Sequence, residues 1–276
     1  MGKGTEAKLQ AMAKKIRETI IEMTYHAGTA GAHVGGALSC ADLLAVLYGD
    51  VMKIDAQNPF LENRDRFILS KGHSSVGHYA ALYAAGFLSA EDIQSFESNG
   101  GAFPAHSVKN VEHGIELSSG SLGLGLSFGI GEALAARKKG LDYKVYVLLG
   151  NGECNEGSVW EAVMLAAQLK LENLYMIIDD NGQQLDGISE SILRIPNLYE
   201  TLQSMGFETN SVDGHSIGNL LHAFTSSGKQ NKPVAIIMNT IKGKGVSFME
   251  NNPMWHHARL QTEEYERAME EIGRDD

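Results

Sequence analysis

The sequence predicts a three-layer α/β protein, in which helices cover both faces of a parallel sheet, and a single domain over residues 1–276. Three observations lead to this prediction. Short apolar runs, typical of buried strands, occur at 66–70, 145–149, 174–178 and 234–238. Segments with apolar residues at helical spacing lie between them, and no Pro/Ser-rich linker divides the chain. Strands that alternate with helices form parallel sheets, which are buried on both faces.

The first helix is expected over 7–26, where apolar residues such as Leu9 and Ile16 recur at helical spacing. Ser89, followed three residues later by Asp92, has the pattern of a helix N-cap. The other helices are expected, in chain order, over 41–52, 122–139, the segment that follows Gly152, 196–205 and 263–271.

Composition disfavours several classes of partner. The chain has 34 acidic and 23 basic residues, and a formal net charge of −11 disfavours binding to nucleic acid or an anionic membrane. The amino terminus lacks the apolar core of a signal peptide, and no apolar run reaches the roughly 18 residues of a membrane span. Cys40 and Cys154 have no metal-ligand spacing, which indicates a reducing compartment and predicts a cytoplasmic location.

The most informative segment runs from Gly150 to Asn181. The apolar run at 145–149 ends at Gly150-Asn151-Gly152-Glu153, and the run at 174–178 ends at Asp179-Asp180-Asn181. Because neighbouring parallel strands end at the same edge of a sheet, oxygen-bearing side chains at the two ends can converge. Glycine at the turn allows close approach of the backbone, so the segment predicts a site for a hard cation together with a diphosphate.

This pattern resembles the thiamin diphosphate signature, G-D-G-E followed after about thirty residues by N. Five further blocks occur in the order found in the amino-terminal part of transketolases: AGAHVGGALSCADLLAVLY, DRFILSKGH, FPAH, GIELSSGSLGLGLS and TIKGKGVSFMENNPMWHH. The resemblance extends from about Leu9 to Glu270. It implies a thiamin diphosphate-binding fold, with thiamin diphosphate and Mg²⁺, or Ca²⁺ or Mn²⁺, as cofactors.

By this resemblance, the metal ligands are the Asn151 and Asn181 side chains and the backbone carbonyl of Gln183. The family carries aspartate where this chain has Asn151. An amide oxygen is a neutral donor, so we expect weaker cation binding than in a relative with the aspartate. The alternative interpretation of Asn151 is an asparagine favoured only by the tight turn.

The resemblance also implies residues that bind the cofactor. They are Gly150, at the turn after the strand, and Gly152 and Glu153, which open the next helix, whose N–H groups can face a phosphate. Glu156 and Glu161 match acids at the interface with a second copy, although both could equally be solvent-facing helix residues.

Gly120, Leu122 and Leu185 match positions that touch the cofactor rings. The alternative for the two leucines is core packing. The run from Gly123 to Gly129 has GxGxxxG rather than GxGxxG spacing, which argues against a dinucleotide site.

Four histidines match family positions in separate blocks. By resemblance His33 and His106 line the substrate channel, and His73 and His256 lie near the diphosphate; His33, His106 and His256 are the catalytic candidates. Imidazole can donate to an anionic oxygen or transfer a proton near neutral pH. His257 occupies a place where relatives usually have glycine, so it either narrows the entrance or binds substrate. The alternative for each of these five histidines is an ordinary surface or core residue. That interpretation is favoured for His26 and His78.

A full-length transketolase continues into domains that bind the aminopyrimidine ring. The resemblance therefore implies a split enzyme, with a second subunit that carries those domains and an α2β2 assembly. The expected reaction transfers a two-carbon ketol unit from a ketose or ketose phosphate to an aldose. Two alternatives stay open: a related enzyme for a modified ketose, and a non-catalytic scaffold that keeps the fold. Within thiamin enzymes, FPAH and the GKGVSFMEN block favour transketolase over a 2-oxoacid dehydrogenase or a 1-deoxyxylulose-5-phosphate synthase.

Overall fold

Five parallel strands form a central sheet in the order β1-β2-β3-β7-β6. The structure is a computed structural model and describes residues 3–274. The strands of the sheet are β1 (Arg66–Leu69), β2 (Val145–Gly150), β3 (Leu174–Asp180), β6 (Glu208–Asp213) and β7 (Val234–Asn239). A separate two-stranded hairpin consists of β4 (Gln183–Gln184) and β5 (Gly187–Ile188), which follow β3 directly.

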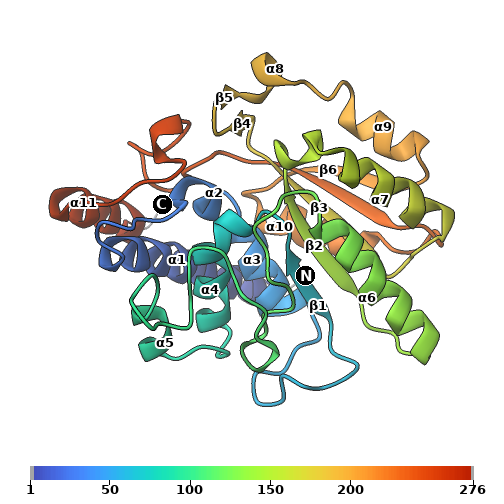
Figure 1. Cartoon of the computed structure of the whole chain (residues 1–276), viewed down its shortest axis with the longest axis horizontal. Helices are drawn as coiled ribbons and strands as arrows, with labels where there is room; N and C mark the ends of the chain where they lie inside the picture. Colours follow the sequence, from blue (N-terminus) through green and yellow to red (C-terminus); the bar gives the residue numbers. More distant parts are fainter. Residues whose placement is uncertain (1–2, 275–276) are drawn as a thin grey trace.

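Helices cover both faces of the sheet, as Figure 1 shows, so the predicted three-layer α/β fold is confirmed. The α-helices are α1 (Lys3–His26), α2 (Val34–Leu38), α3 (Ala41–Val46), α4 (Ser75–Ala84), α5 (Ala90–Gln94), α6 (Gly125–Lys139), α7 (Gly157–Gln168), α8 (Ser189–Ile192), α9 (Leu198–Ser204), α10 (Ile217–Ser226) and α11 (Thr262–Gly273). A π-helical turn at Leu47–Val51 continues α3, and 3₁₀ turns occur at Gly72–Ser74, Val111–His113, Glu153–Asn155 and Pro253–Trp255. Within the described residues, no helix combines the length and the apolar character needed to cross a bilayer.

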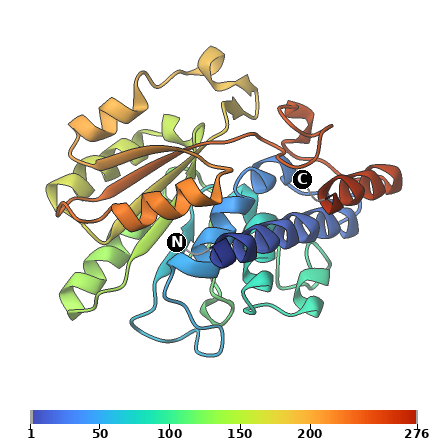
Figure 2. The same ribbon diagram turned by 180° about the vertical axis from the view of Figure 1, so that it is seen from behind.

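The sheet separates two hydrophobic cores. Alternate residues of each central strand point to opposite faces, so that Tyr146 and Leu148 lie in one core and Val147 and Leu149 in the other. Helices α1, α3, α4, α10 and α11 pack in the first core, and α6, α7 and α9 pack in the second. The reverse view in Figure 2 shows α1 alongside α11 on the first side. Because β2 and β3 are buried on both faces, their ends are held in fixed positions.

The ends of β2 and β3 lie side by side at one edge of the sheet. Gly150 pairs in register with Asp179, and Asp180 pairs with Asn239 of β7. The expected convergence of the two strand ends is therefore confirmed. In Figure 1 the β4–β5 hairpin and α8 extend beyond this edge.

Several boundaries and elements differ from the sequence prediction. The helix expected over 122–139 begins at Gly125, and the segment after Gly152 forms a 3₁₀ turn before α7 begins at Gly157. The helix expected over 41–52 changes to π-helical geometry after Val46. Strand β6 and helices α4 and α10 were not predicted. The N-cap at Ser89 is confirmed as a full capping box with Asp92.

Candidate functional site

A buried ion pair lies directly beneath the ends of β2 and β3. Lys71 Nζ donates to Asp179 Oδ2 at 2.6 Å and to the Gly36 carbonyl at 2.8 Å. The Asp179 carboxylate also accepts from Ser39 Oγ at 2.7 Å and from Thr240 Oγ1 at 2.5 Å. Asp179 thus ties the end of β3 to three other segments: the end of α2, the turn after β1 and the turn after β7.

The charges of this pair stabilise each other. Burial by itself would raise the pKa of Asp179, but Lys71 and the hydroxyl donors outweigh it, and the pKa of this carboxyl is lowered. Burial would likewise lower the pKa of Lys71, but Asp179 keeps it raised. Both groups therefore stay charged at neutral pH and form a rigid support for the strand ends.

The asparagines expected as metal ligands lie at the adjoining strand ends. The backbone N–H of Asn151 donates to the Asp179 carbonyl at 3.1 Å, and its side-chain Nδ2 donates to Ser189 Oγ at 2.7 Å. Asn181 donates from Nδ2 to Asp179 Oδ2 at 3.0 Å, and its Oδ1 accepts from the Gln183 N–H at 3.1 Å. Gln183 Oε1 is buried and has no hydrogen-bond partner. The structure therefore brings all three predicted ligand residues to one place.

Glu153, which was expected to bind the cofactor, points into the protein. Its carboxylate accepts from Ser70 Oγ at 2.5 Å, from the Gly123 N–H at 2.8 Å and from the Gly150 N–H at 3.1 Å. Burial raises its pKa. Gly123 has a φ of +82°, and a side chain there would clash with Glu156. Glu153 therefore shapes the turns on either side of the site, and its carboxylate already accepts three hydrogen bonds within the protein.

Five imidazole rings cluster beside the ion pair. The ring of His33 lies 5.3 Å from His73, 5.7 Å from His106, 5.4 Å from His256 and 4.5 Å from His257, measured between centroids. His33 follows α1 and His73 belongs to the turn before α4, so these rings come together from distant parts of the chain. The four histidines that match family positions are thus brought into one cluster.

The inner histidines are neutral at physiological pH. Burial lowers the pKa of His33 to about 3, that of His73 to about 2 and that of His256 to about 4. Lys242, whose Nζ is 2.8 Å from His256 Nδ1, also disfavours their protonation. Burial and repulsion from Lys71 lower the pKa of Lys242 itself to about 8. A neutral imidazole keeps one N–H donor and one lone pair, so each can either donate to an anion or accept a proton.

Two glycines lie directly against this cluster. A side chain at Gly36 would lie 3.7 Å from His73 Nε2 and 3.1 Å from the buried, unpartnered Ser74 Oγ. A side chain at Gly120 would lie 3.7 Å from His106 Cδ2. Glycine at these positions keeps side-chain atoms away from the two imidazoles.

Leu122 and Leu185 are exposed at the surface, with exposed fractions of 37% and 65%. The interpretation of these two residues as core packing is therefore wrong. Leu185 belongs to the turn of the β4–β5 hairpin, where Ile188 is also exposed. These leucines are available to contact a cofactor ring or another chain.

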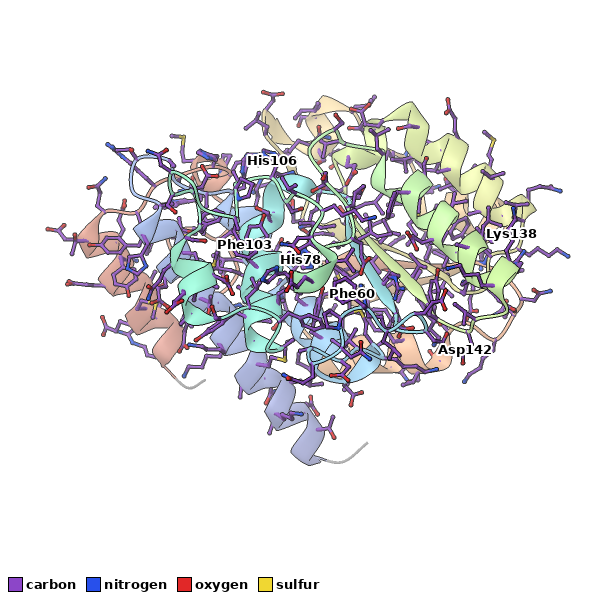
Figure 3. The ribbon with its side chains drawn as sticks, turned by 60° about the horizontal axis from the view of Figure 1, so that its bottom comes forward. Phe60, His78, Phe103, His106, Lys138 and Asp142 are labelled. Atoms are coloured by element: carbon purple, nitrogen blue, oxygen red, sulfur yellow. The ribbon has the colours of Figure 1, made fainter. Side chains whose placement is uncertain are left out.

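Two of the histidines considered in the sequence analysis, His78 and His26, lie outside the cluster. His78 is buried, and a 2.8 Å hydrogen bond joins its Nε2 to the hydroxyl of Tyr48. In Figure 3 it lies closer to the middle of the molecule than the exposed His106. His26 ends α1 beside Tyr25. The interpretation of these two residues as ordinary histidines fits their positions, since His78 is in the core and His26 is at the surface.

The sequence analysis did not single out Lys71 and Lys242, the buried cations of the site. Over residues 3–274, no group of three or more His, Cys, Asp or Glu side chains is arranged to hold a metal ion. A cation at this edge would therefore depend on the amide and carbonyl oxygens of Asn151, Asn181 and Gln183, and on oxygens of the ligand itself.

Comparison with known sequences gives a consistent result. Residues 9–276 match the family described as "Transketolase, thiamine diphosphate binding domain". The chain is 38% identical over 266 residues to an apulose-4-phosphate transketolase subunit of Phocaeicola vulgatus, and the match covers 96% of this chain and 94% of that one. It is 37% identical over 268 residues to a 6-deoxy-6-sulfo-D-fructose transketolase subunit of Clostridium sp., covering 97% of each.

Solved structures give the same match. Transketolase from Leishmania mexicana superposes with a TM-score of 0.89 at 31% identity, over 97% of this chain and 41% of that one. Human transketolase is 33% identical over 274 residues, which is 98% of this chain and 43% of the human protein. The chain thus spans less than half the length of these transketolases, whereas it matches the separate subunits over nearly their full length.

Proposed function

Because this chain belongs to the transketolase family, as its match to the thiamine diphosphate binding domain over residues 9–276 shows, we propose that it is the diphosphate-binding subunit of a two-chain transketolase. The enzyme transfers a two-carbon ketol unit from a ketose, or ketose phosphate, to an aldose. The observation that carries this proposal is the cluster of neutral histidines beside the joined ends of β2 and β3.

The residues at the strand ends fit a diphosphate held through a divalent ion. Asn151 and Asn181 would supply side-chain amide oxygens, and Gln183 would supply its backbone carbonyl. The side-chain Oε1 of Gln183 is also buried there without a hydrogen-bond partner in the protein. Mg²⁺ would take its remaining ligands from the diphosphate and water, and Ca²⁺ or Mn²⁺ could replace it. His73 would donate a hydrogen bond to the phosphates, and the cation Lys242 would neutralise part of their charge. When bound, thiamin diphosphate supplies the electron sink that lets a carbon–carbon bond next to a carbonyl break.

The histidines around His33 would hold and move protons on the substrate. His33 Nδ1 is buried and has no hydrogen-bond partner in the protein, so a substrate hydroxyl that reached it would satisfy it. His106, on the exposed side of the cluster, would bind the outer part of the sugar. His256 is hydrogen-bonded to Lys242 and would transfer a proton between substrate and solvent. Burial and the nearby Lys242 keep the His256 imidazole neutral, which a proton acceptor must be.

A second subunit would complete the site. The relatives of equal length are named as transketolase subunits, which supports a separate partner that carries the pyrimidine-binding and carboxy-terminal domains. Exposed apolar residues at the site, Leu122 and Leu185, would be covered by that partner. Glu156 and Glu161 are exposed near and on α7 and would face a second copy, giving an α2β2 assembly. We place the enzyme in the cytoplasm, since both cysteines are unpaired.

A modified ketose is the second candidate substrate. Two relatives are named for apulose-4-phosphate and 6-deoxy-6-sulfo-D-fructose, and His257 adds an imidazole next to His33 at 4.5 Å. An additional donor at the exposed side of the cluster suits a sugar with an extra anionic or branched group. A scaffold without turnover has less support, because the family histidines are all present and clustered.

Calorimetry and a ketol-transfer assay test the proposal. We expect the chain, mixed with its partner subunit, to bind thiamin diphosphate only when a divalent ion is present, and to transfer a ketol unit from a ketose phosphate or modified ketose to an aldose. Cofactor binding without transfer from any ketose would indicate a scaffold. Absence of cofactor binding by the folded two-chain mixture would contradict the proposed function.

A further inference from the structure

The Asn151 amide is hydrogen-bonded to a residue that lies far from it in the sequence. Asn151 Nδ2 donates to Ser189 Oγ at 2.7 Å, across 38 positions of the chain. The Ser189 backbone N–H in turn donates to the Gly182 carbonyl at 3.0 Å. Gly182 lies between Asn181 and Gln183, so Ser189 is tied to both parts of the expected cation site.

An asparagine ligand needs such an orienting partner more than an aspartate does. A carboxylate has two equivalent oxygens, and either of them can bind a cation. An amide has one oxygen and one NH₂ group, and with the NH₂ group turned to the cation it would repel it. The amide therefore binds metal in only one of its two orientations.

We propose that Ser189 is a positioning residue for the cation site: it accepts from Asn151 Nδ2 and thereby keeps Asn151 Oδ1 turned toward the metal. This inference rests on the proposed function, because it assumes that a cation binds at the ends of β2 and β3. The backbone contact to Gly182 holds Ser189 itself in place. The first turn of α8 thus compensates for the aspartate that this chain lacks.

The surroundings of the contact make the hydrogen bond important. Asn151 and Ser189 both line a pocket of about 270 Å³, together with Asp180 and Gly182. Asn151 is only half-buried, so without Ser189 the amide is free to turn and to exchange its partner for water. Partners that orient a metal ligand typically change metal affinity by about 10- to 100-fold when removed.

The test measures Mn²⁺ affinity in the two-chain complex saturated with thiamin diphosphate, by electron paramagnetic resonance of free Mn²⁺. Ser189→Ala should weaken Mn²⁺ binding by about 10-fold. Ser189→Thr keeps the hydroxyl and should restore most of the affinity. Ser191→Ala, on the same short helix α8 with an exposed side chain, is the matched control and should bind as wild type does.

A double-mutant cycle separates positioning from general damage. In an Asn151→Asp background, Ser189→Ala should change Mn²⁺ affinity by less than about 2-fold, because a carboxylate needs no orientation. The side-chain amide protons of Asn151 should also exchange faster with solvent in Ser189→Ala, a readout that requires no metal. Wild-type affinity in Ser189→Ala, or an equal loss in both backgrounds, would overturn the inference while leaving the proposed function intact. Wild-type protein that binds neither Mn²⁺ nor thiamin diphosphate would overturn both.

Discussion

Replacement of Lys71 by methionine tests whether the buried ion pair supports the ends of β2 and β3. The side chains of Lys71 and Asp179 are only 2% and 0% exposed, and their charged atoms are 2.6 Å apart. Methionine preserves the length of the stem but leaves the Asp179 carboxylate buried without its counter-ion. Breaking a buried pair in this way typically costs about 3–5 kcal/mol of folding free energy. Ser39, Asn181 and Thr240 still donate to Asp179. We therefore expect a loss of folding free energy of about 3 kcal/mol rather than about 5 kcal/mol.

Urea unfolding, followed by far-ultraviolet circular dichroism, measures this loss. With an m-value of about 3 kcal/mol per M, the midpoint of Lys71→Met should fall by roughly 1 M. Lys139→Met removes an exposed lysine from a surface pair with Glu62 and is the matched control, whose midpoint should stay unchanged. Adding Asp179→Asn to Lys71→Met should cost less than the sum of the single losses, since no unpaired charge then remains. A midpoint for Lys71→Met equal to that of Lys139→Met would refute the reasoning.

Three further predictions concern the histidines and the cation site. Because the pKa values of His33, His73 and His256 are lowered to about 3, 2 and 4, the unfolded chain takes up protons first as the pH falls below about 6.5. The free energy of unfolding should therefore decrease between pH 6.5 and 4, by at most about 1.4 kcal/mol per pH unit for each histidine. His33→Gln should make this decrease less steep. A free energy of unfolding that stays constant over this range would contradict the burial of neutral imidazoles. Asn151→Asp should lower the Mg²⁺ concentration needed for half-maximal cofactor binding, because it adds a negative charge to the site, and equal titration midpoints would remove that idea. His257→Gly should raise KM for the sugar more than it lowers kcat, with the thermal midpoint unchanged because the ring is exposed; wild-type KM values for every ketose tested would show that this ring does not contact substrate.

The central part of the fold could be predicted because its strands are buried on both faces. Burial on both faces requires apolar residues at successive positions, which explains the apolar runs in β1, β2, β3 and β7. Edge strand β6 alternates between buried and solvent-facing residues and contains Asn210 and Ser211, so it gave no apolar run. Helix α4 is enclosed on nearly all sides, which removes the periodicity that marks an amphipathic helix. Helix α10 did carry a signal, with an N-cap at Ser216 and apolar residues at helical spacing.

The site could be predicted where the chain resembles a known family. The histidines and asparagines were expected at the site because they match family positions, and the structure brings the histidines into one cluster and the asparagines to the ends of β2 and β3. Lysine gives no such indication, because an isolated lysine is normally exposed. The burial of Lys71 depends on Asp179, which lies 108 residues further along the chain, so no local pattern contains both. The inward turn of Glu153 likewise depends on Ser70 and Gly123, which come from other segments.

The most direct test of the account is a crystal structure of the two-chain complex with thiamin diphosphate and Mn²⁺, with anomalous scattering used to locate the metal. The account predicts a manganese peak at coordination distance from the side-chain oxygens of Asn151 and Asn181, with the diphosphate beside His73. A manganese peak elsewhere, or a diphosphate bound away from the ends of β2 and β3, would contradict it.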